Sequence, residues 1–388
     1  MRGKPGRLSA LCGGALTAVV LLAGCAPCVV PAGAPQLHYL GQVLLAPGTT
    51  FEGTVVGGLS GISYDPDRDC YYVISDDRSA HGPARFYTMR LAVSERGVDD
   101  VRVTAVHPLR DEHGRTFAPR DFDASPPVVP PDPEGIAFDA GRRLLYWSSE
   151  GERRTGDPGT GPVLADPWIR TAGPDGAYLG RFVLPPQLTM SARPTGPRRN
   201  MALEGLTVAP DGGMLFAAME GPGYDDGALP DRSRGAPTRV TAYRLGSDEG
   251  PPTPVAQYAY PLEPTPPDAD PAQTNGLTDL VALSDEEFLV IERVFGDRPT
   301  VRVFRAQIAD ATDVLAMPVL ANAAVTPMTK TLVADLSATA GLDPLDNIEG
   351  ITLGPRLPDG RQTVVLVSDD NFSPRQVTQF VAFAMPAE

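Results

Sequence analysis

Leu203-Glu204-Gly205-Leu206 is one copy of a four-residue motif that recurs along the whole chain, and this repeat decides the fold. The other copies are Leu59-Ser60-Gly61-Ile62, Pro133-Glu134-Gly135-Ile136, Leu277-Thr278-Asp279-Leu280 and Ile348-Glu349-Gly350-Ile351. The third position, a glycine or Asp279, falls at residues 61, 135, 205, 279 and 350, so successive copies lie 70 to 74 residues apart. A nearly constant period of this length indicates a repeat architecture.

Four β-type segments fill each repeat, and the motif opens the first of them. The second segments each end in an acid: Tyr71 to Asp76, Leu145 to Glu150, Leu215 to Glu220, Phe288 to Glu292 and Val364 to Asp369. The third segments are Arg85 to Leu91, Trp168 to Arg170, Thr238 to Leu245, Thr300 to Ile308 and Gln376 to Phe383. The fourth segments are Val101 to Leu109, Tyr178 to Leu184, Val255 to Leu262 and Lys330 to Leu336.

The fifth outer segment is supplied by the N-terminus, at His38 to Leu45. Its Tyr39-Leu40-Gly41 resembles Tyr178-Leu179-Gly180, so we expect it to complete the last repeat. Prolines (42) and glycines (40) punctuate the segments, and no stretch keeps a helical period. The sequence therefore predicts an all-β fold, a β-propeller of four-stranded antiparallel blades closed by the N-terminal strand. We expect five blades, with six as the alternative if Asp111 to Pro131 or Pro251 to Pro271 hides an irregular blade.

The N-terminus carries an export signal. Arg2, Lys4 and Arg7 precede an apolar run, Leu8 to Leu22, that is of signal-peptide length and too short for a comfortable membrane span. The run ends in Leu22-Ala23-Gly24-Cys25, which resembles a bacterial lipobox. We therefore expect residues 1–24 to be a lipoprotein signal peptide, 25–37 an anchor and linker, and 38–388 the propeller. An ordinary secretory signal is the alternative.

We therefore expect the protein to be exported and lipid-anchored through Cys25, on the extracytoplasmic face of the outer or cytoplasmic membrane. We also expect it to be a monomer. Two further cysteines, Cys28 and Cys70, could pair in an oxidising compartment, and the sequence leaves this open.

The charge of the chain restricts its partners. The formal net charge is −15, and loss of the signal peptide's three positive charges makes it more negative. This disfavours nucleic acid and anionic lipid surfaces and favours cations and small molecules. With four histidines and no nucleophile elbow, phosphate-binding loop or dinucleotide fingerprint, the chain lacks the usual material for a serine triad or a nucleotide site.

Two sets of polar residues are expected to meet at one mouth of the channel, because the first strand of a blade begins beside the end of the second. The inner set is Ser60, Glu134, Glu204, Thr278 and Glu349. The outer set is Asp76, Glu150, Glu220, Glu292 and Asp369. Three carboxylates and two hydroxyls around one axis are hard oxygen ligands, so the inner set predicts a Ca²⁺ site. The alternative is that these groups only bond to backbone N–H groups of neighbouring blades.

Four arginines follow the outer acids: Arg375 after Asp369, and the three site candidates Arg78, Arg153 and Arg293. Above a calcium site these three candidates would bind a phosphate group through paired hydrogen bonds, and with Asp76 and Asp369 they are the candidate catalytic residues. The alternative is simple pairing with the neighbouring acids.

Several motifs together resemble the phytase-like propeller family, often described as "esterase-like activity of phytase". The residues that carry the resemblance are Gly58 to Ile62, Ser75 to Arg78, Asp132 to Ile136, Asn200 to Leu206, Asn347 to Ile351 and Ser368 to Phe372. It covers about residues 38 to 385 and implies a calcium-dependent propeller. The five-residue inner set is also similar in arrangement to calcium-activated apyrases, a likeness of architecture only.

Three functions fit these observations. The first is a calcium-dependent phosphoesterase or esterase-like hydrolase of the cell envelope, which uses a metal-held water at the propeller mouth. The second is a lactonase or carboxylesterase. The third is a non-catalytic envelope module that calcium stabilises.

Overall fold

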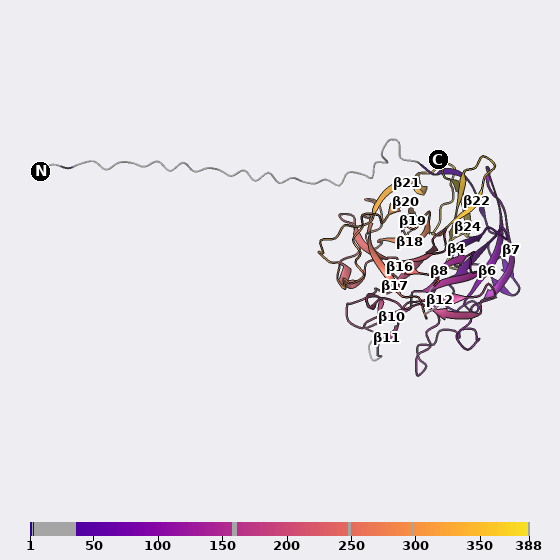
Figure 1. Cartoon of the computed structure of the whole chain (residues 1–388), viewed down its shortest axis with the longest axis horizontal. Helices are drawn as coiled ribbons and strands as arrows, with labels where there is room; N and C mark the ends of the chain where they lie inside the picture. The colour runs from indigo at the N-terminus through magenta and orange to yellow at the C-terminus, as the bar shows by residue number, and fades with distance from the viewer. Residues whose placement is uncertain (2, 4–35, 157–160, 247–249, 297, 387–388) are drawn as a thin grey trace.

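Five four-stranded antiparallel sheets surround a common centre in the computed structural model (Figure 1). The structure describes residues 1, 3, 36–156, 161–246, 250–296 and 298–386. We number the sheets blade 1 to blade 5 in chain order. Within the described residues there is no sixth four-stranded sheet, so the protein is a five-bladed β-propeller.

The strand bounds agree closely with the predicted segments. Blade 1 consists of β4 (Leu59–Asp65), β5 (Cys70–Ser75), β6 (Arg85–Ser94) and β7 (Gly97–Pro108). Blade 2 consists of β8 (Pro133–Asp139), β9 (Leu144–Ser149), β12 (Trp168–Ala172) and β13 (Tyr178–Arg181). Blade 3 consists of β14 (Leu203–Val208), β15 (Met214–Met219), β16 (Ala236–Arg244) and β17 (Pro254–Leu262). Blade 4 consists of β18 (Asn275–Ala282), β19 (Glu287–Val294), β20 (Thr300–Gln307) and β21 (Thr329–Asp335).

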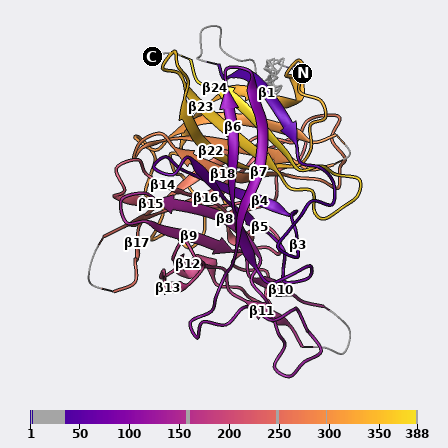
Figure 2. The same ribbon diagram turned by 90° about the vertical axis from the view of Figure 1, so that its right-hand side faces the viewer.

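Blade 5 closes the ring with strands from both ends of the chain. It consists of β22 (Ile348–Arg356), β23 (Gln362–Ser368), β24 (Gln379–Ala384) and β1 (His38–Leu44). β1 pairs antiparallel with β24, from His38 opposite Ala384 to Leu44 opposite Gln379 (Figure 2). The prediction that the N-terminal strand completes the last blade is confirmed.

Short elements lie in the connections. They are two hairpins, β2 (Thr50–Phe51) with β3 (Thr54–Val55) and β10 (Glu152–Arg154) with β11 (Val163–Ala165), and the 3-10 helices η1 (Pro186–Leu188), η2 (Tyr224–Asp226) and η3 (Leu336–Ala338). Figure 2 shows the β10–β11 hairpin among long loops at one end of the molecule.

The hydrophobic core is divided into five main layers, each between two neighbouring blades. Between blades 1 and 2 the layer contains Tyr72 and Trp147, and between blades 3 and 4 the rings of Phe216 and Phe288 meet at 4.7 Å. Each blade therefore buries its two faces only against its neighbours, as expected for a radial repeat.

The predicted signal peptide lies almost wholly outside the described residues, and so do Cys25 and Cys28. Cys70 is buried at the start of β5. Among the described residues, no helix is long and apolar enough to cross a membrane.

Candidate functional site

A β-bulge occurs at the same place in all five inner strands. In blade 1 the register with the second strand shifts between Leu59 and Ile62, and in blade 3 between Leu203 and Leu206. Blades 2, 4 and 5 show the same shift beside Glu134, Thr278 and Glu349. Because a bulge redirects side chains, the inner set sits where the strand pairing is broken.

The motif glycine is required by the close approach of the next blade. A Cβ on Gly61 would lie 2.6 Å from the carbonyl oxygen of Glu134, and a Cβ on Gly135 would lie 2.5 Å from that of Glu204. A Cβ on Gly350 would likewise collide with the backbone of Ser60, which closes the ring. Only glycine fits such contacts, so this position sets the spacing of the blades.

The two predicted sets meet at one mouth. The backbone N–H of Asp76 donates to the carbonyl of Gly58, two residues before Ser60, at 2.8 Å. The same bond recurs from Glu150 to Asp132, from Glu220 to Ala202 and from Asp369 to Asn347. The end of each second strand is thereby fixed beside an inner-set residue in these four blades.

A cavity of about 760 Å³ opens at this mouth. All five blades contribute charged residues to its wall, namely Asp76, Asp77, Arg78, Arg120, Glu134, Glu204, Glu220, Arg293, Glu349 and Asp369. Ser60 and Thr278 complete the inner set and are both 2% exposed. Burial raises the pKa of Glu349, against the opposing effects of Arg293 and of hydrogen bonds from Asn347 and Ser60.

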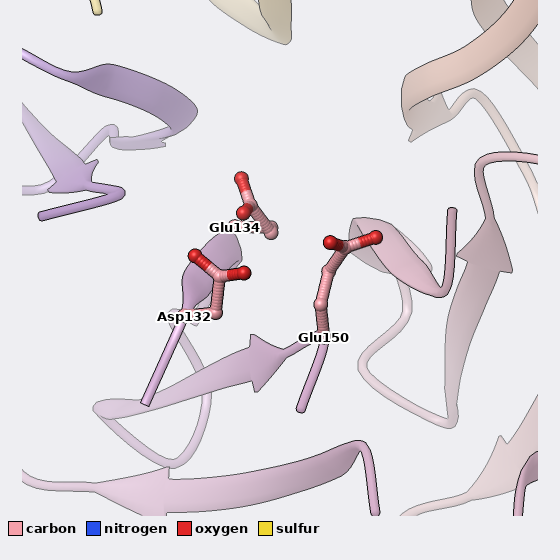
Figure 3. Close-up of side chains that lie close together, drawn as sticks. All are labelled: Asp132, Glu134 and Glu150. Atoms are coloured by element: carbon pink, nitrogen blue, oxygen red, sulfur yellow. The ribbon is translucent and has the colours of Figure 1, made fainter. Parts of the chain in front are cut away.

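Two groups of three carboxylates have the spacing of metal ligands. They are Asp132 with Glu134 and Glu150, and Glu150 with Glu204 and Glu220. In each group, one oxygen per residue lies within 4.8 Å of the others. Figure 3 shows the first group, whose side chains gather around one space at the start of β8 and the end of β9. Glu150 belongs to both groups.

Glu150 Oε2 and Thr278 Oγ1 are among the buried oxygen atoms at the mouth that have no hydrogen-bond partner in the described residues. Ser79 Oγ, at the cavity wall, is another. The other oxygen of Glu150 accepts the backbone N–H of Ala202 at 2.6 Å. A buried oxygen without a donor is costly, and a bound cation supplies a partner for such an atom. The donor set therefore fits Ca²⁺, which takes six to eight oxygen ligands in flexible geometry.

Burial and mutual repulsion hold protons on these acids. Burial, followed by the neighbouring carboxylates, raises the pKa well above the ordinary range at Asp76, Glu134, Glu150, Glu204 and Asp369. Burial raises the pKa of Asp132 to about 6 and that of Glu220 to about 7, against the opposing effects of Arg78 and Arg293. Carboxylates so close together cannot all ionise unless a cation joins them.

Two arginines face the acids from opposite parts of the ring. Arg78 pairs with Asp132 and donates to Asn200 Oδ1 at 2.6 Å. Arg293 pairs with Glu220 at 3.1 Å and with Glu349 at 3.4 Å. Arg293 is only 10% exposed, whereas Arg78 is 27% exposed, so Arg78 is the more accessible to a ligand.

In blade 4 the structure differs from the predicted outer set at one residue. Glu292 pairs with Leu277, as Ser75 pairs with Leu59, so the position after the second strand belongs to Arg293. Glu292 points to the other face, where it accepts from Tyr260 and pairs with Lys330.

This difference arises because the turn between the first and second strands is one residue shorter in blade 4 than in blade 1. In blade 1 Tyr64 pairs with Tyr71, whereas at the same point in blade 4 Ala282 pairs with Phe288. A shift of one residue moves every side chain to the opposite face of the strand. The prediction that Glu292 joins the mouth is therefore wrong.

Arg153 is not among the described residues that line the cavity. Its guanidinium donates to the carbonyl oxygens of Ser191 and Arg193 and lies 4.7 Å from the ring of Tyr224. The structure therefore brings Arg78 and Arg293 to the mouth and holds Arg153 against the 191–193 loop.

Strained backbone is concentrated around the cavity. Eight described non-glycine residues have positive φ, and four of them line it: Ser79, Asn200, Asn371 and Phe372. Each such conformation costs roughly 1–3 kcal/mol, and strain of this kind clusters at functional sites.

Sequence reasoning gave no role to Asp132, Asn200 or Asn347. Asp132 completes a carboxylate group, and the two asparagine side chains accept from the two arginines. The available signal was position, because Asp132 and Asn347 both stand two residues before an inner-set glutamate.

The chain belongs to the Phytase-like family, described as "Esterase-like activity of phytase", whose model matches residues 54–372. The resemblance seen in the sequence is thereby confirmed. No curated protein matches the chain.

Solved structures resemble the chain only distantly. A gluconolactonase from Xanthomonas campestris has 11% identity over 94% of this chain and 99% of its own, with a TM-score of 0.35. A GH43 β-1,3-galactosidase has 11% identity, 89% and 96% coverage and a TM-score of 0.42. A hypothetical protein from Leishmania major has 10% identity, 88% and 90% coverage and a TM-score of 0.36. Likenesses this weak carry no argument about activity.

Proposed function

We propose that the protein is a calcium-dependent hydrolase of phosphoric esters that acts in the cavity at the propeller mouth. The observation that carries the proposal is the pair of carboxylate groups sharing Glu150, at a cavity whose wall also holds Arg78 and Arg293, each paired with an acid of the mouth. Bound Ca²⁺ would be held by these groups with the inner set, and it would neutralise their charge and polarise an ester oxygen.

The arginines would bind and orient the ester. A guanidinium presents parallel N–H donors that match two oxygens of a phosphate group. Arg78 is kept in place by Asp132 and Asn200, and Arg293 by Asn347 and the acids on either side. Arginines fixed in this way lose little freedom when the substrate binds.

Asp76 and Asp369 would move the proton. Both line the cavity, and burial raises the pKa of each well above its ordinary value. A carboxyl group that keeps its proton near neutral pH is suited to donate it to the leaving oxygen.

Calcium dependence is tested by assay and by titration. We expect the purified protein to release phosphate from members of a phosphomonoester panel in Ca²⁺ and not in EGTA. Calorimetric titration of Glu134→Gln should show weakened calcium binding, whereas Glu95→Gln, at an exposed position, should bind like the wild type.

The outcomes separate the alternatives. Turnover of lactones or aryl carboxylic esters with phosphate esters untouched would replace the proposed reaction by the second one. Calcium binding that raises thermal stability, with no turnover of any ester, would make the propeller a non-catalytic module. Unchanged calcium binding by Glu134→Gln would contradict the proposed metal site.

We also propose that the chain is a lipoprotein of the bacterial envelope, anchored through Cys25. The proposal is supported by the lipobox-like Leu22-Ala23-Gly24-Cys25. β1 begins at the end of blade 5 that lies opposite the Ile348 mouth, so a tether there would leave the cavity facing away from the membrane. Mass spectrometry of the membrane fraction should detect a diacylglyceryl group on Cys25, absent in Cys25→Ser.

A further inference from the structure

The cavity has a second chemical region at its edge, distinct from the carboxylates. Three ring side chains line it there: His81, Phe295 and Phe372. We call them the aromatic lip. Neither phenylalanine belongs to any of the hydrophobic core clusters found among the described residues. Packing of the fold therefore does not account for their position.

Phe372 is held in place at a cost. Its φ is +50° and that of Asn371 is +47°, so two successive residues are in the left-handed region that disfavours side chains. Asp370 fixes this turn, because its Oδ1 accepts the backbone N–H groups of Phe372 and Gly58 at 3.0 and 2.9 Å. A Cβ on Gly58 would lie 2.5 Å from the Phe372 ring, so glycine is needed beneath it.

His81 extends the surface of Phe372. The two rings stack with centroids 4.2 Å apart and planes 18° apart, and His81 is exposed. Phe295 follows β19 of blade 4, which adjoins the blade of Phe372. Its side chain is 39% exposed, and the guanidinium of Arg293 lies 5.8 Å from its ring centroid. The lip therefore presents rings to solvent beside one of the arginines expected to bind the ester.

Exposed, fixed rings at the edge of a polar cavity are suited to bind another ring. Aromatic faces stack on flat or apolar rings and lose little conformational entropy in doing so. The carboxylates and arginines deeper in the cavity can bind an ester group, but they offer no surface to its apolar part.

We propose that the aromatic lip binds a ring carried by the substrate, so that the cavity takes esters of ring-bearing alcohols, aryl or sugar, in preference to small alkyl esters. The inference rests on the proposed function, because the ester group is assigned to the arginines and the metal ligands. It adds the class of leaving group and the residues that select it.

Binding of non-hydrolysable phosphonates tests this without requiring turnover. Calorimetry in Ca²⁺ compares phenylphosphonate, cyclohexylphosphonate and methylphosphonate on the full chain. We expect phenylphosphonate to bind about tenfold more tightly than methylphosphonate, since one favourable ring contact is worth roughly that factor. Tighter phenyl binding would assign the preference to aryl groups, tighter cyclohexyl binding to saturated rings such as sugars, and equal affinity to rings of both kinds.

Variants locate the preference. Phe295→Ala and His81→Ala, both at exposed positions, should each reduce the phenyl-to-methyl ratio to about twofold, and Leu179→Ala, on the outer strand β13, should keep it. An unchanged ratio in both lip variants would overturn the proposal. Equal wild-type affinity for the phenyl and methyl compounds would also overturn it and leave the proposed function standing, whereas no binding of any phosphonate would overturn both.

Discussion

Blade 4 differs from blades 2, 3 and 5 at three positions of the same mouth. Blades 2, 3 and 5 place a glutamate in the inner set, a glycine after it and an acid at the end of the second strand. Blade 4 has Thr278, Asp279 and Arg293 at these positions.

The effect is to place a buried cation, Arg293, between the acids Glu220 of blade 3 and Glu349 of blade 5. Both groups of carboxylates with metal-ligand spacing come from the first two strands of blades 2 and 3 and the residues next to them. The buried arginine, Arg293, comes from blade 4. A repeat of identical blades would have made a symmetric acidic ring. Arg78 of blade 1 and Arg293 of blade 4 interrupt that ring.

Asp279 has a second role in blade 4. Its side chain accepts backbone N–H groups from Leu206 of blade 3 and Ile351 of blade 5, besides its own neighbour Leu280. Where the other blades touch through a glycine, blade 4 is joined to both neighbours by one buried carboxylate.

The largest effect is expected from removing the charge of Arg293. Arg293→Met leaves Glu220 and Glu349 buried without a cation, which should lower the free energy of unfolding by about 3 kcal/mol or more in EGTA. Calcium should restore part of this loss. Urea denaturation measures it, with Arg102→Met, at a 76% exposed position, as the control. A loss equal to that of the control would contradict the pairing.

The next effect concerns the link between blades. Asp279→Gly restores the glycine of the other repeats but removes the acceptor of three backbone N–H groups, and we expect a loss of about 2 kcal/mol. Asp279→Asn keeps one acceptor oxygen and should lose less. If thermal denaturation shows Asp279→Gly to be as stable as the wild type, blade 4 closes on its neighbours as the glycine blades do.

A smaller effect is expected from pH on the calcium-free protein. The folded state raises the pKa of Glu220 to about 7, so it binds more protons than the unfolded chain between about pH 4.5 and 7. Stability from this group is therefore present at low pH and is lost as pH rises through 7. Melting temperatures in EGTA should fall from pH 5 to pH 8, less steeply in Glu220→Gln, and Ca²⁺ should flatten the slope. A rise over this range in EGTA would contradict the prediction.

The smallest effect is expected at Arg153. Because its guanidinium contacts the 191–193 loop and does not line the cavity, Arg153→Ala should change kcat/KM by less than about twofold. Arg78→Ala should lower it by about tenfold or more, since it removes a charged donor to the ester. Equal losses of kcat/KM in the two variants would show that Arg153 acts at the site.

The sequence by itself determined the fold and the location of the candidate site. The repeat spacing and the alternation of apolar segments favoured five blades over six, and the match of residues 39–41 to 178–180 predicted the closing strand. Antiparallel pairing alone required the two polar sets to share a mouth. These features are local or follow from the general geometry of antiparallel strands, so they can be predicted without knowledge of the tertiary structure.

Only the tertiary structure decided which side chains face the cavity. The shorter turn in blade 4 exchanged Glu292 for Arg293, and nothing in the residue types of that strand distinguishes the two registers. Asp132 and the aromatic lip gained their roles from contacts between residues far apart in the chain, as when Gly58 makes room for Phe372. Orientation at a site depends on single-residue register and on the packing of neighbouring blades, and the repeat pattern is insensitive to both.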